Sequence, residues 1–119
     1  MTKLKFSTNL GQFSVLLNEE KAPNTCKNFL EYVKAGSYNN IIFHRVIKGF
    51  MAQAGTMNMD GSERGCNPPI QNEANNGLSN EKYTIAMART GDPHSAAAQF
   101  FINTGHNRAL DYSMDTVQG

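Results

Sequence analysis

The sequence predicts a mainly β protein, an antiparallel sheet or barrel that carries one packed amphipathic helix. Six short segments have strand-like composition, and one segment has a clear helical period. Glycine, asparagine and proline stand between these segments at positions typical of turns. The 119 residues suit a single domain. A chain of this size buries roughly two thirds of its unfolded surface, which is enough for one core.

An opening hairpin is expected from two alternating segments, residues 3–8 and 12–17. Asn9, Leu10 and Gly11 lie between them, and a glycine there can take the positive φ that a tight turn requires.

One amphipathic helix is predicted over residues 23–35. Pro23 suits the first helical turn, and Gly36 is a natural stop. Between them, apolar residues recur at helical spacing at Cys26, Phe29, Leu30 and Val33.

The remaining strands are shorter and more scattered. The candidates are residues 41–46, 50–54, 83–89 and 100–103, with a reversal at 47–49 between the first two. Residues 55–79 are rich in Gly, Asn, Ser and Met, so we expect a long loop there, of the kind that is often functional. Residues 105–119 are polar and have no clear period.

Composition excludes several classes of partner. Eleven basic residues nearly balance ten acidic residues, so no charge pattern favours nucleic acid or an anionic membrane. The N-terminus lacks the apolar run of a secretory signal, and no stretch is long enough to span a bilayer. We therefore expect a cytoplasmic protein, in which Cys26 and Cys66 are free thiols.

Two blocks carry the chemistry. The first runs Phe-His-Arg-Val-Ile-Lys-Gly-Phe-Met-Ala-Gln over residues 43–53, and the second runs Gln-Phe-Phe-Ile-Asn over residues 99–103. They combine one arginine, two glutamines and several aromatic side chains. Alternation along a strand sends Phe100 and Phe101 to opposite faces, so one should lie in the core and the other in a pocket. The three histidines are far apart and lack ligand partners, so neither a metal site nor a cofactor is expected.

These blocks, together with Asn-Glu-Ala-Asn-Asn-Gly-Leu at residues 72–78, resemble the bacterial cytoplasmic cyclophilin-type peptidyl-prolyl cis/trans isomerases. The resemblance runs from about Leu4 to the end of the chain. It implies a cyclophilin-like antiparallel β-barrel and acceleration of Xaa-Pro bond rotation in peptides and folding proteins, without a cofactor. The substrates it implies are proline-containing peptides and unfolded chains.

The same resemblance implies the site residues. It assigns catalysis to Arg45 and Gln53, with Arg45 as the donor to the prolyl nitrogen. It assigns substrate binding to Phe50, Met51, Ala88, Arg89, Gln99, Phe101 and Leu110. Without the family context, Arg45 would be interpreted as a surface or salt-bridging arginine, and Gln53 as a half-exposed strand residue.

Two departures from the family pattern leave alternatives open. Ala109 stands where relatives carry a bulky aromatic residue, which argues against tight cyclosporin binding. The chain stops at Gly119, before the family's last strands, so residues 1–119 are expected to form one domain with an incomplete barrel. Exposed strand edges recruit other chains, which leaves a homodimer open. A non-catalytic module that holds proline-containing segments, or an inert fragment, is the alternative function.

Overall fold

The computed structural model describes residues 1–112. Its elements are β1 (Thr2–Thr8), β2 (Gly11–Leu17), α1 (Pro23–Lys34), β3 (Arg45–Ile47), β4 (Met51–Ala54), the 3₁₀ turn η1 (Ala74–Asn76), β5 (Ile85–Met87), β6 (Phe100–Asn103) and the 3₁₀ turn η2 (Arg108–Leu110). Within this part of the chain the strands form two antiparallel sheets, one of two strands and one of four. The predicted cyclophilin-like barrel, incomplete at its C-terminus, stays a prediction.

The opening hairpin is confirmed. β1 and β2 pair antiparallel over their full length, from Thr2 opposite Leu17 to Thr8 opposite Gly11. Gly11 has a φ of 137°, the positive value expected at the turn. One face of the hairpin packs on the core through Leu4, Phe6, Val15 and Leu17.

The helix is confirmed as well, and ends at Lys34, one residue before the predicted end. Pro23 occupies the first turn, where its missing N–H removes no hydrogen bond. Of the predicted apolar positions, Cys26 and Phe29 are buried, and Leu30 and Val33 pack partly buried against the core. Tyr32 is buried as well. Gly36 follows the helix with a φ of 73°, a conformation that glycine adopts without steric strain.

The four-stranded sheet has the order β3-β4-β6-β5. β3 and β4 form a hairpin whose turn contains Gly49 at a φ of 76°. Two predicted strands are longer than the strands that form. Of residues 41–46 only the end belongs to β3, while Ile41 makes an isolated bridge with Asn58. Of residues 83–89 only 85–87 belong to β5, because Tyr83 has a φ of 70° and cannot continue the strand.

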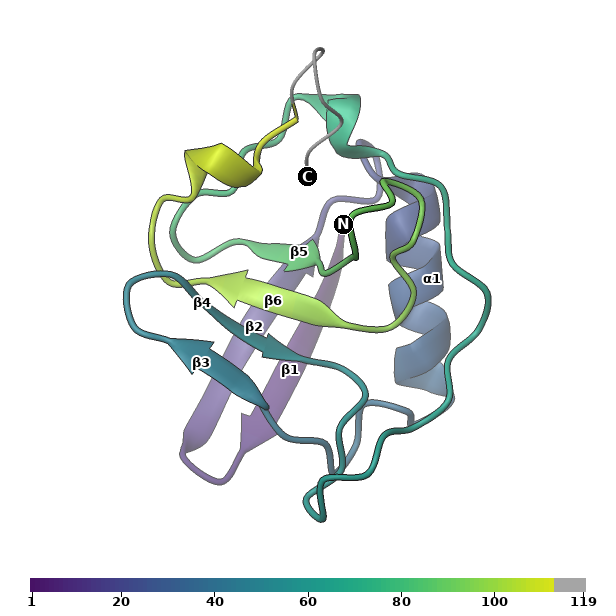
Figure 1. Ribbon diagram of the computed structural model, residues 1–119, viewed down its shortest axis with the longest axis vertical. Helices are drawn as coiled ribbons and strands as arrows, with labels where there is room; N and C mark the ends of the chain where they lie inside the picture. Colours follow the sequence, from purple (N-terminus) through teal and green to yellow (C-terminus); the bar gives the residue numbers. More distant parts are fainter. Residues whose placement is uncertain (113–119) are drawn as a thin grey trace.

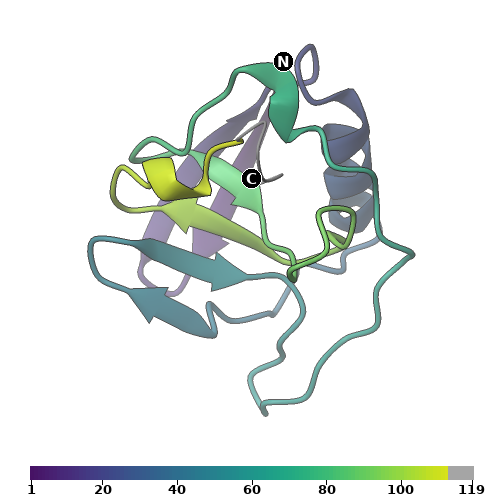
Figure 2. The same ribbon diagram turned by 45° about the horizontal axis from the view of Figure 1, so that its top comes forward.

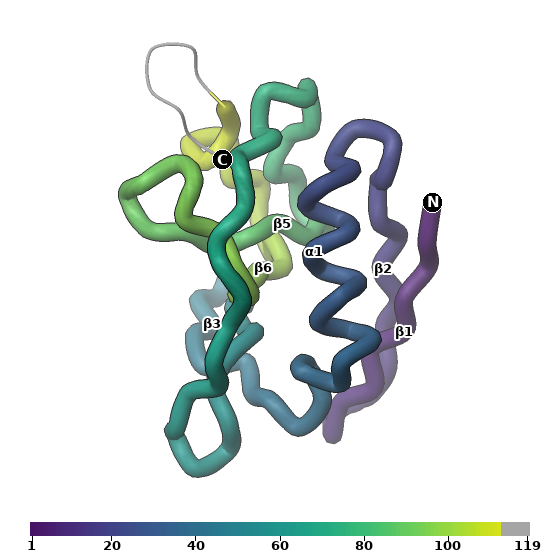
Figure 3. The backbone as a smooth tube through the Cα atoms, turned by 90° about the vertical axis from the view of Figure 1, so that its right-hand side faces the viewer, coloured from purple at the N-terminus to yellow at the C-terminus, as the bar shows by residue number. Residues whose placement is uncertain are grey.

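Phe100 is the centre of the core, with 1% of its surface exposed. Edge-to-face ring contacts join it to Phe6 of the hairpin, Phe29 of α1, and both Tyr38 and Phe43 of the segment before β3, at centroid distances of 5.2 to 6.4 Å. Figures 1 and 3 show the arrangement: the hairpin crosses behind the four-stranded sheet, and α1 lies beside both. One aromatic residue of β6 therefore ties together all three layers.

The long loop from residue 55 to residue 73 runs along the outside of α1 (Figure 3). Polar contacts fasten it there. Arg64 donates to the Ser37 carbonyl at 2.6 Å, and the Asn67 N–H donates to the Tyr32 hydroxyl at 2.8 Å. None of the helices within residues 1–112 is long and apolar enough to cross a membrane.

Candidate active site

Three predicted site residues form one row across the four-stranded sheet. Arg45 of β3 lies opposite Gln53 of β4, and Gln53 lies opposite Phe101 of β6. Ala86 of β5 completes the row opposite Phe101. Directly opposed residues of paired strands project to the same face, so these side chains share one surface. Phe100, the neighbour of Phe101, projects to the other face and enters the core, as alternation predicts.

A pocket of about 370 Å³ opens on this surface. Its lining is Arg45, Phe50, Met51, Gln53, Met87, Ala88, Arg89, Thr90, Phe101 and Leu110. Every residue predicted for the site lies in this lining except Gln99. The lining also contains Met87 and Thr90, which the sequence analysis did not assign, although both flank the predicted pair Ala88 and Arg89.

Arg45 is the exposed cation at the rim. Among residues 1–112 no side chain or carbonyl forms a hydrogen bond or ion pair with its guanidinium. An arginine stays charged at any physiological pH and holds its N–H donors in a rigid plane. The donors of Arg45 are therefore available to a molecule in the pocket.

Gln99 lies behind the pocket and orients Gln53. The Gln53 Nε2 donates to Gln99 Oε1 at 2.7 Å, and Gln99 Nε2 donates in turn to Thr56 Oγ1 at 3.1 Å. This relay fixes the side-chain amide of Gln53, whose oxygen remains an acceptor for a ligand. Gln99 thus positions Gln53, and its predicted contact with substrate stays a prediction.

Ala88 and Arg89 extend the edge strand β5 along the pocket. The Ala88 N–H donates to the Gln99 carbonyl at 2.9 Å, which continues the pairing with β6 by one residue. The Arg89 guanidinium donates to the Thr90 carbonyl at 2.9 Å, so this arginine is held in place. Of the two arginines in the lining, Arg45 is therefore the one that can meet a ligand freely.

The histidines and cysteines play no part in this pocket. His94 Nδ1 accepts from the Asn72 N–H at 3.0 Å, and His106 Nδ1 accepts from the Lys82 N–H at 3.3 Å. No group of His, Cys, Asp and Glu within residues 1–112 could hold a metal ion. Cys26 and Cys66 are free thiols, one buried and one exposed.

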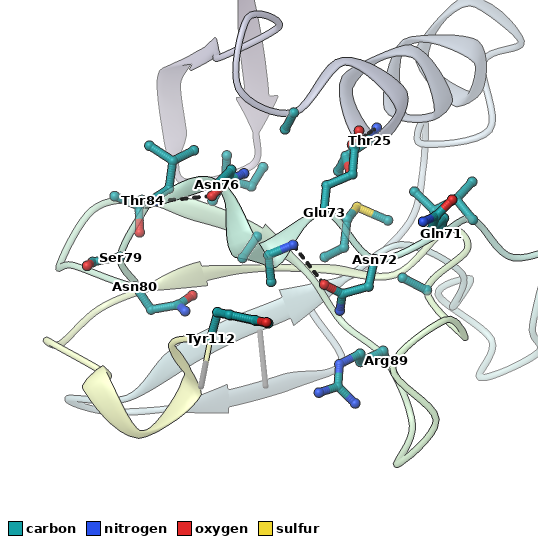
Figure 4. Close-up of a pocket in the computed structure, with 18 residues that line it drawn as sticks. Thr25, Gln71, Asn72, Glu73, Asn76, Ser79, Asn80, Thr84, Arg89 and Tyr112 are labelled. Atoms are coloured by element: carbon teal, nitrogen blue, oxygen red, sulfur yellow. Dashed lines mark hydrogen bonds between the residues drawn. The ribbon is translucent and has the colours of Figure 1, made fainter. Parts of the chain in front are cut away.

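A second pocket, of about 160 Å³, shares Met87 and Arg89 with the first. Figure 4 shows the residues that line this second pocket. Its acidic group, Glu73, accepts from the Thr25 N–H at 2.7 Å and from the Thr25 hydroxyl at 2.6 Å, which caps the N-terminus of α1. Asn72 Oδ1 accepts from the Ala74 N–H at 2.7 Å, as the dashed line in Figure 4 marks. These polar groups serve the fold, so the second pocket offers less for chemistry than the first.

The first pocket combines a free, permanently charged donor with an apolar recess and a fixed amide. Its lining contains no Ser, Cys or His nucleophile and no carboxylate, so it suits a reaction that is accelerated by donor placement and shape.

Comparison with known proteins identifies the class. Residues 3–119 match the family described as cyclophilin type peptidyl-prolyl cis-trans isomerase/CLD. Peptidyl-prolyl cis-trans isomerase B of Escherichia coli is 52% identical over 114 residues, which cover 96% of this chain and 70% of that protein. Peptidyl-prolyl cis-trans isomerase cyp18 of Streptomyces antibioticus is 49% identical over the whole chain, which covers 72% of that protein.

Solved structures agree. A cyclophilin-type isomerase of Cryptosporidium parvum has a TM-score of 0.78 at 28% identity, over 92% of this chain and 72% of that one. The cyclophilin AquaCyp293 of Hirschia baltica has a TM-score of 0.76 at 25% identity, over 90% of this chain and 59% of that one. The chain therefore belongs to the cyclophilin-type peptidyl-prolyl cis/trans isomerases, enzymes that interconvert the cis and trans forms of Xaa-Pro bonds.

Proposed function

We propose that the 370 Å³ pocket is where this chain accelerates Xaa-Pro rotation, with Arg45 as the catalytic donor. The observation that carries the proposal is the register of the sheet, which aligns Arg45, Gln53 and Phe101 on one face. The aligned face supplies a donor, an acceptor and an apolar surface within one pocket.

The reaction needs little beyond those three groups. Amide resonance imposes a barrier of roughly 18–20 kcal/mol on rotation about the peptide bond. In the twisted transition state the prolyl nitrogen becomes pyramidal and regains a lone pair, which can accept a hydrogen bond. A donor aimed at that nitrogen stabilises the twisted state more than either planar state. Arg45 is the group with free donors in the lining.

The apolar lining residues Phe50, Met51, Phe101 and Leu110 are proposed to hold the pyrrolidine ring. The ring carries three methylene groups, so its transfer from water contributes roughly 2 kcal/mol of binding free energy. Binding the ring there fixes the C-terminal side of the rotating bond. The remaining requirement is a grip on the flanking backbone.

Gln53, Ala88 and Arg89 are proposed to supply that grip. The oxygen of Gln53 is held by the relay through Gln99, and Ala88 and Arg89 follow β5, an outer strand of the sheet within the described residues. An extended peptide can pair with such an edge through its backbone. Held on both sides of the proline, the peptide can rotate only about the bond that faces Arg45.

The proposed substrates are proline-containing peptides and unfolded chains. The Cryptosporidium parvum relative was crystallised in the presence of the dipeptide Ala-Pro, which supports this class of ligand for the shared fold. Slow Xaa-Pro isomerisation limits the folding of many chains, so unfolded proteins are the natural physiological target.

Replacing Arg45 by alanine tests the catalytic role. We expect kcat/KM for a short Xaa-Pro peptide to fall by about tenfold or more, which corresponds to about 1.4 kcal/mol of lost transition-state stabilisation. Peptide binding should be largely retained. Arg108→Ala, which removes an exposed arginine outside the lining, is the matched control. An unchanged rate in Arg45→Ala refutes the role of Arg45, and a wild-type chain that binds peptide without turnover would be a binding module instead.

Three broader expectations stay proposals. We propose that residues 1–119 form one domain, that its sheets belong to a cyclophilin-like barrel, and that the protein acts in the cytoplasm. Association of two copies through the outer edges of β3 and β5 is proposed on the exposure of those edges. Native mass spectrometry at micromolar concentration would show the dimer, and a monomer throughout that range would exclude it.

A further inference from the structure

One wall of the site is built without regular sheet structure. Residues 104–112 leave the end of β6 and pass through η2, the short yellow helical turn in Figure 2. η2 contains Leu110, which lines the pocket. Phe50, which lies in the β3–β4 turn region, also lines the recess. Whatever fixes the 104–112 segment against Phe50 therefore helps to fix the shape of the recess.

Asn107 makes that connection. Its side-chain Nδ2 donates to the Phe50 carbonyl at 2.8 Å, and its own carbonyl accepts from the Leu110 N–H at 3.0 Å. A single residue thus holds the backbone of one wall through its side chain and the backbone of the other wall through its main chain. The Thr104 N–H also donates to the Phe50 carbonyl, at 3.0 Å, but among residues 1–112 Asn107 is the residue that bonds to both Phe50 and Leu110.

Asn107 is itself anchored in a polar cluster around the buried Asn103. Its Nδ2 also donates to Asn103 Oδ1 at 2.7 Å, and Asn103 is fully buried. Asn103 Nδ2 donates to Asn80 Oδ1 at 3.1 Å and to Thr84 Oγ1 at 3.0 Å. The Asn107 N–H donates to the Asn80 carbonyl at 2.8 Å. Buried amides satisfied on several sides in this way hold their positions firmly.

The far end of the segment is anchored to the same cluster. Asp111 Oδ1 accepts from the Asn80 N–H at 2.7 Å and from Asn80 Nδ2 at 3.0 Å. Asn80 therefore fixes the segment on both sides of Leu110, at Asn107 and at Asp111. We call Asn80, Asn103, Asn107 and Asp111 the asparagine clamp.

We propose that Asn107, through the asparagine clamp, is a positioning residue that sets the separation of Phe50 and Leu110 and thereby selects a five-membered ring in the pocket. This inference rests on the proposed function of the pocket. Asn107 does not line the pocket, so it acts through the two walls that it joins. A pocket of fixed width discriminates against one extra methylene by about 10- to 200-fold.

The test compares proline with its six-membered homologue, pipecolic acid, in otherwise identical peptides. In Asn107→Ala the Phe50 carbonyl keeps the hydrogen bond from the Thr104 N–H but loses the side-chain bond to the residue that also holds Leu110, so the recess can widen. We expect KM for the proline peptide to rise about fivefold with kcat within about twofold of wild type, the pattern of lost uniform binding. The ratio of kcat/KM for the proline peptide to that for the pipecolate peptide should fall by about fivefold or more.

Two further variants separate positioning from general stability. Asn107→Asp keeps the size of the side chain but cannot donate, so it should behave like the alanine variant. Asn75→Ala removes an exposed asparagine of η1 and should match wild type in both KM and the peptide ratio. If Asn107→Ala does not fold, Asn107→Ser, which keeps one donor, is measured in its place.

The outcomes are distinct. An unchanged proline-to-pipecolate ratio in a folded variant overturns the proposal, as does a fall in kcat with KM unchanged, because a merely structural role lowers only the amount of active enzyme. The dissociation constants of both peptides, from NMR titration, supply the same ratio without turnover. A wild-type chain with no isomerase activity would therefore refute the proposed function and still leave the role of Asn107 decided by binding.

Discussion

Gly55, the residue after β4, is expected to be indispensable to both stability and activity. It is buried at a φ of 140°. A Cβ atom at this position would lie 2.6 Å from the Cα of Gln99 and 2.7 Å from the carbonyl oxygen of Ala98. Both obstacles are backbone atoms, which cannot rotate away as a side chain can.

The cost of Gly55→Ala has two parts. Restoring an ordinary contact of 3.4 Å requires the backbone at Ala98 and Gln99 to retreat by roughly 0.8 Å. Overpacking of this kind destabilises by about 1–3 kcal/mol. The positive φ adds about 1–3 kcal/mol for a residue with a Cβ atom. Together we expect a loss of about 2–6 kcal/mol in the free energy of unfolding.

The displaced segment also serves the site. Gln99 fixes the amide of Gln53, and its carbonyl accepts the Ala88 N–H. Misplacement of a catalytic group by about 1 Å can lower the rate by about 100-fold. We therefore expect kcat/KM of Gly55→Ala to fall by about tenfold or more even in solutions where the variant is fully folded.

Substitutions at two other glycines separate the steric cost of Gly55→Ala from the cost of its positive φ. Gly61 has a φ of 87° but open space around its Cα, so Gly61→Ala carries only the conformational cost. Gly91 has open space and no positive φ, so Gly91→Ala should resemble wild type. Urea unfolding and peptide turnover are measured on all three variants. The steric argument fails if Gly55→Ala is no less stable than Gly61→Ala, or if its turnover is that of wild type.

Two further predictions concern carboxylates that do not line the first pocket. Glu73 caps α1 through the N–H and hydroxyl groups of Thr25, so Glu73→Ala should lower the free energy of unfolding by about 1–2 kcal/mol, while the exposed Glu31→Ala should change it far less. Equal effects in urea unfolding would contradict the cap. The Asn80 N–H lowers the pKa of Asp111, so Asp111 stabilises the fold above its ordinary pKa of about 4, and this stabilisation is lost as pH falls through the lower folded value. The stability difference between wild type and Asp111→Asn should shrink from pH 7 to pH 3, and parallel pH profiles would exclude the effect.

Local patterns predicted much of the fold. The hairpin and α1 follow from alternation and from helical spacing, each punctuated by a glycine whose observed φ is positive, Gly11 and Gly36. The lengths of β3 and β5 could not be predicted from local patterns, because a strand ends where its backbone pairing with the neighbouring strand ends. Tyr83 has strand composition but adopts a positive φ, and its N–H donates to the Asn103 carbonyl at 2.7 Å. Such a contact between distant segments leaves no local signal in the sequence.

The candidate site likewise contains residues that the sequence predicted and residues that it did not. Most residues that line the pocket were predicted from the family resemblance of the two blocks and of the segments around Ala88 and Leu110, whereas Met87 and Thr90 were not predicted. The residues that hold the pocket residues in place were not recognised as such from the sequence. Gln99 was assigned to substrate, and Asn107 was not singled out, since an asparagine between Gly105 and Leu110 reads as an ordinary loop residue. Their roles depend on carbonyls at Phe50 and amides at Gln53, which only the folded chain brings near.

The contrast between pocket-lining residues, which were largely predicted, and supporting residues, which were not, has a physical origin in the reaction. Xaa-Pro rotation breaks no bond and transfers no proton, so catalysis depends on where a donor and a recess stand more than on the ionisation of any group. Position is set by the shell behind the pocket: the Gln53–Gln99–Thr56 relay, the asparagine clamp and the close approach at Gly55. A change there alters neither the charge nor the surface that substrate touches. If placement governs the rate, Gly55→Ala should nevertheless reduce turnover by about as many fold as Arg45→Ala.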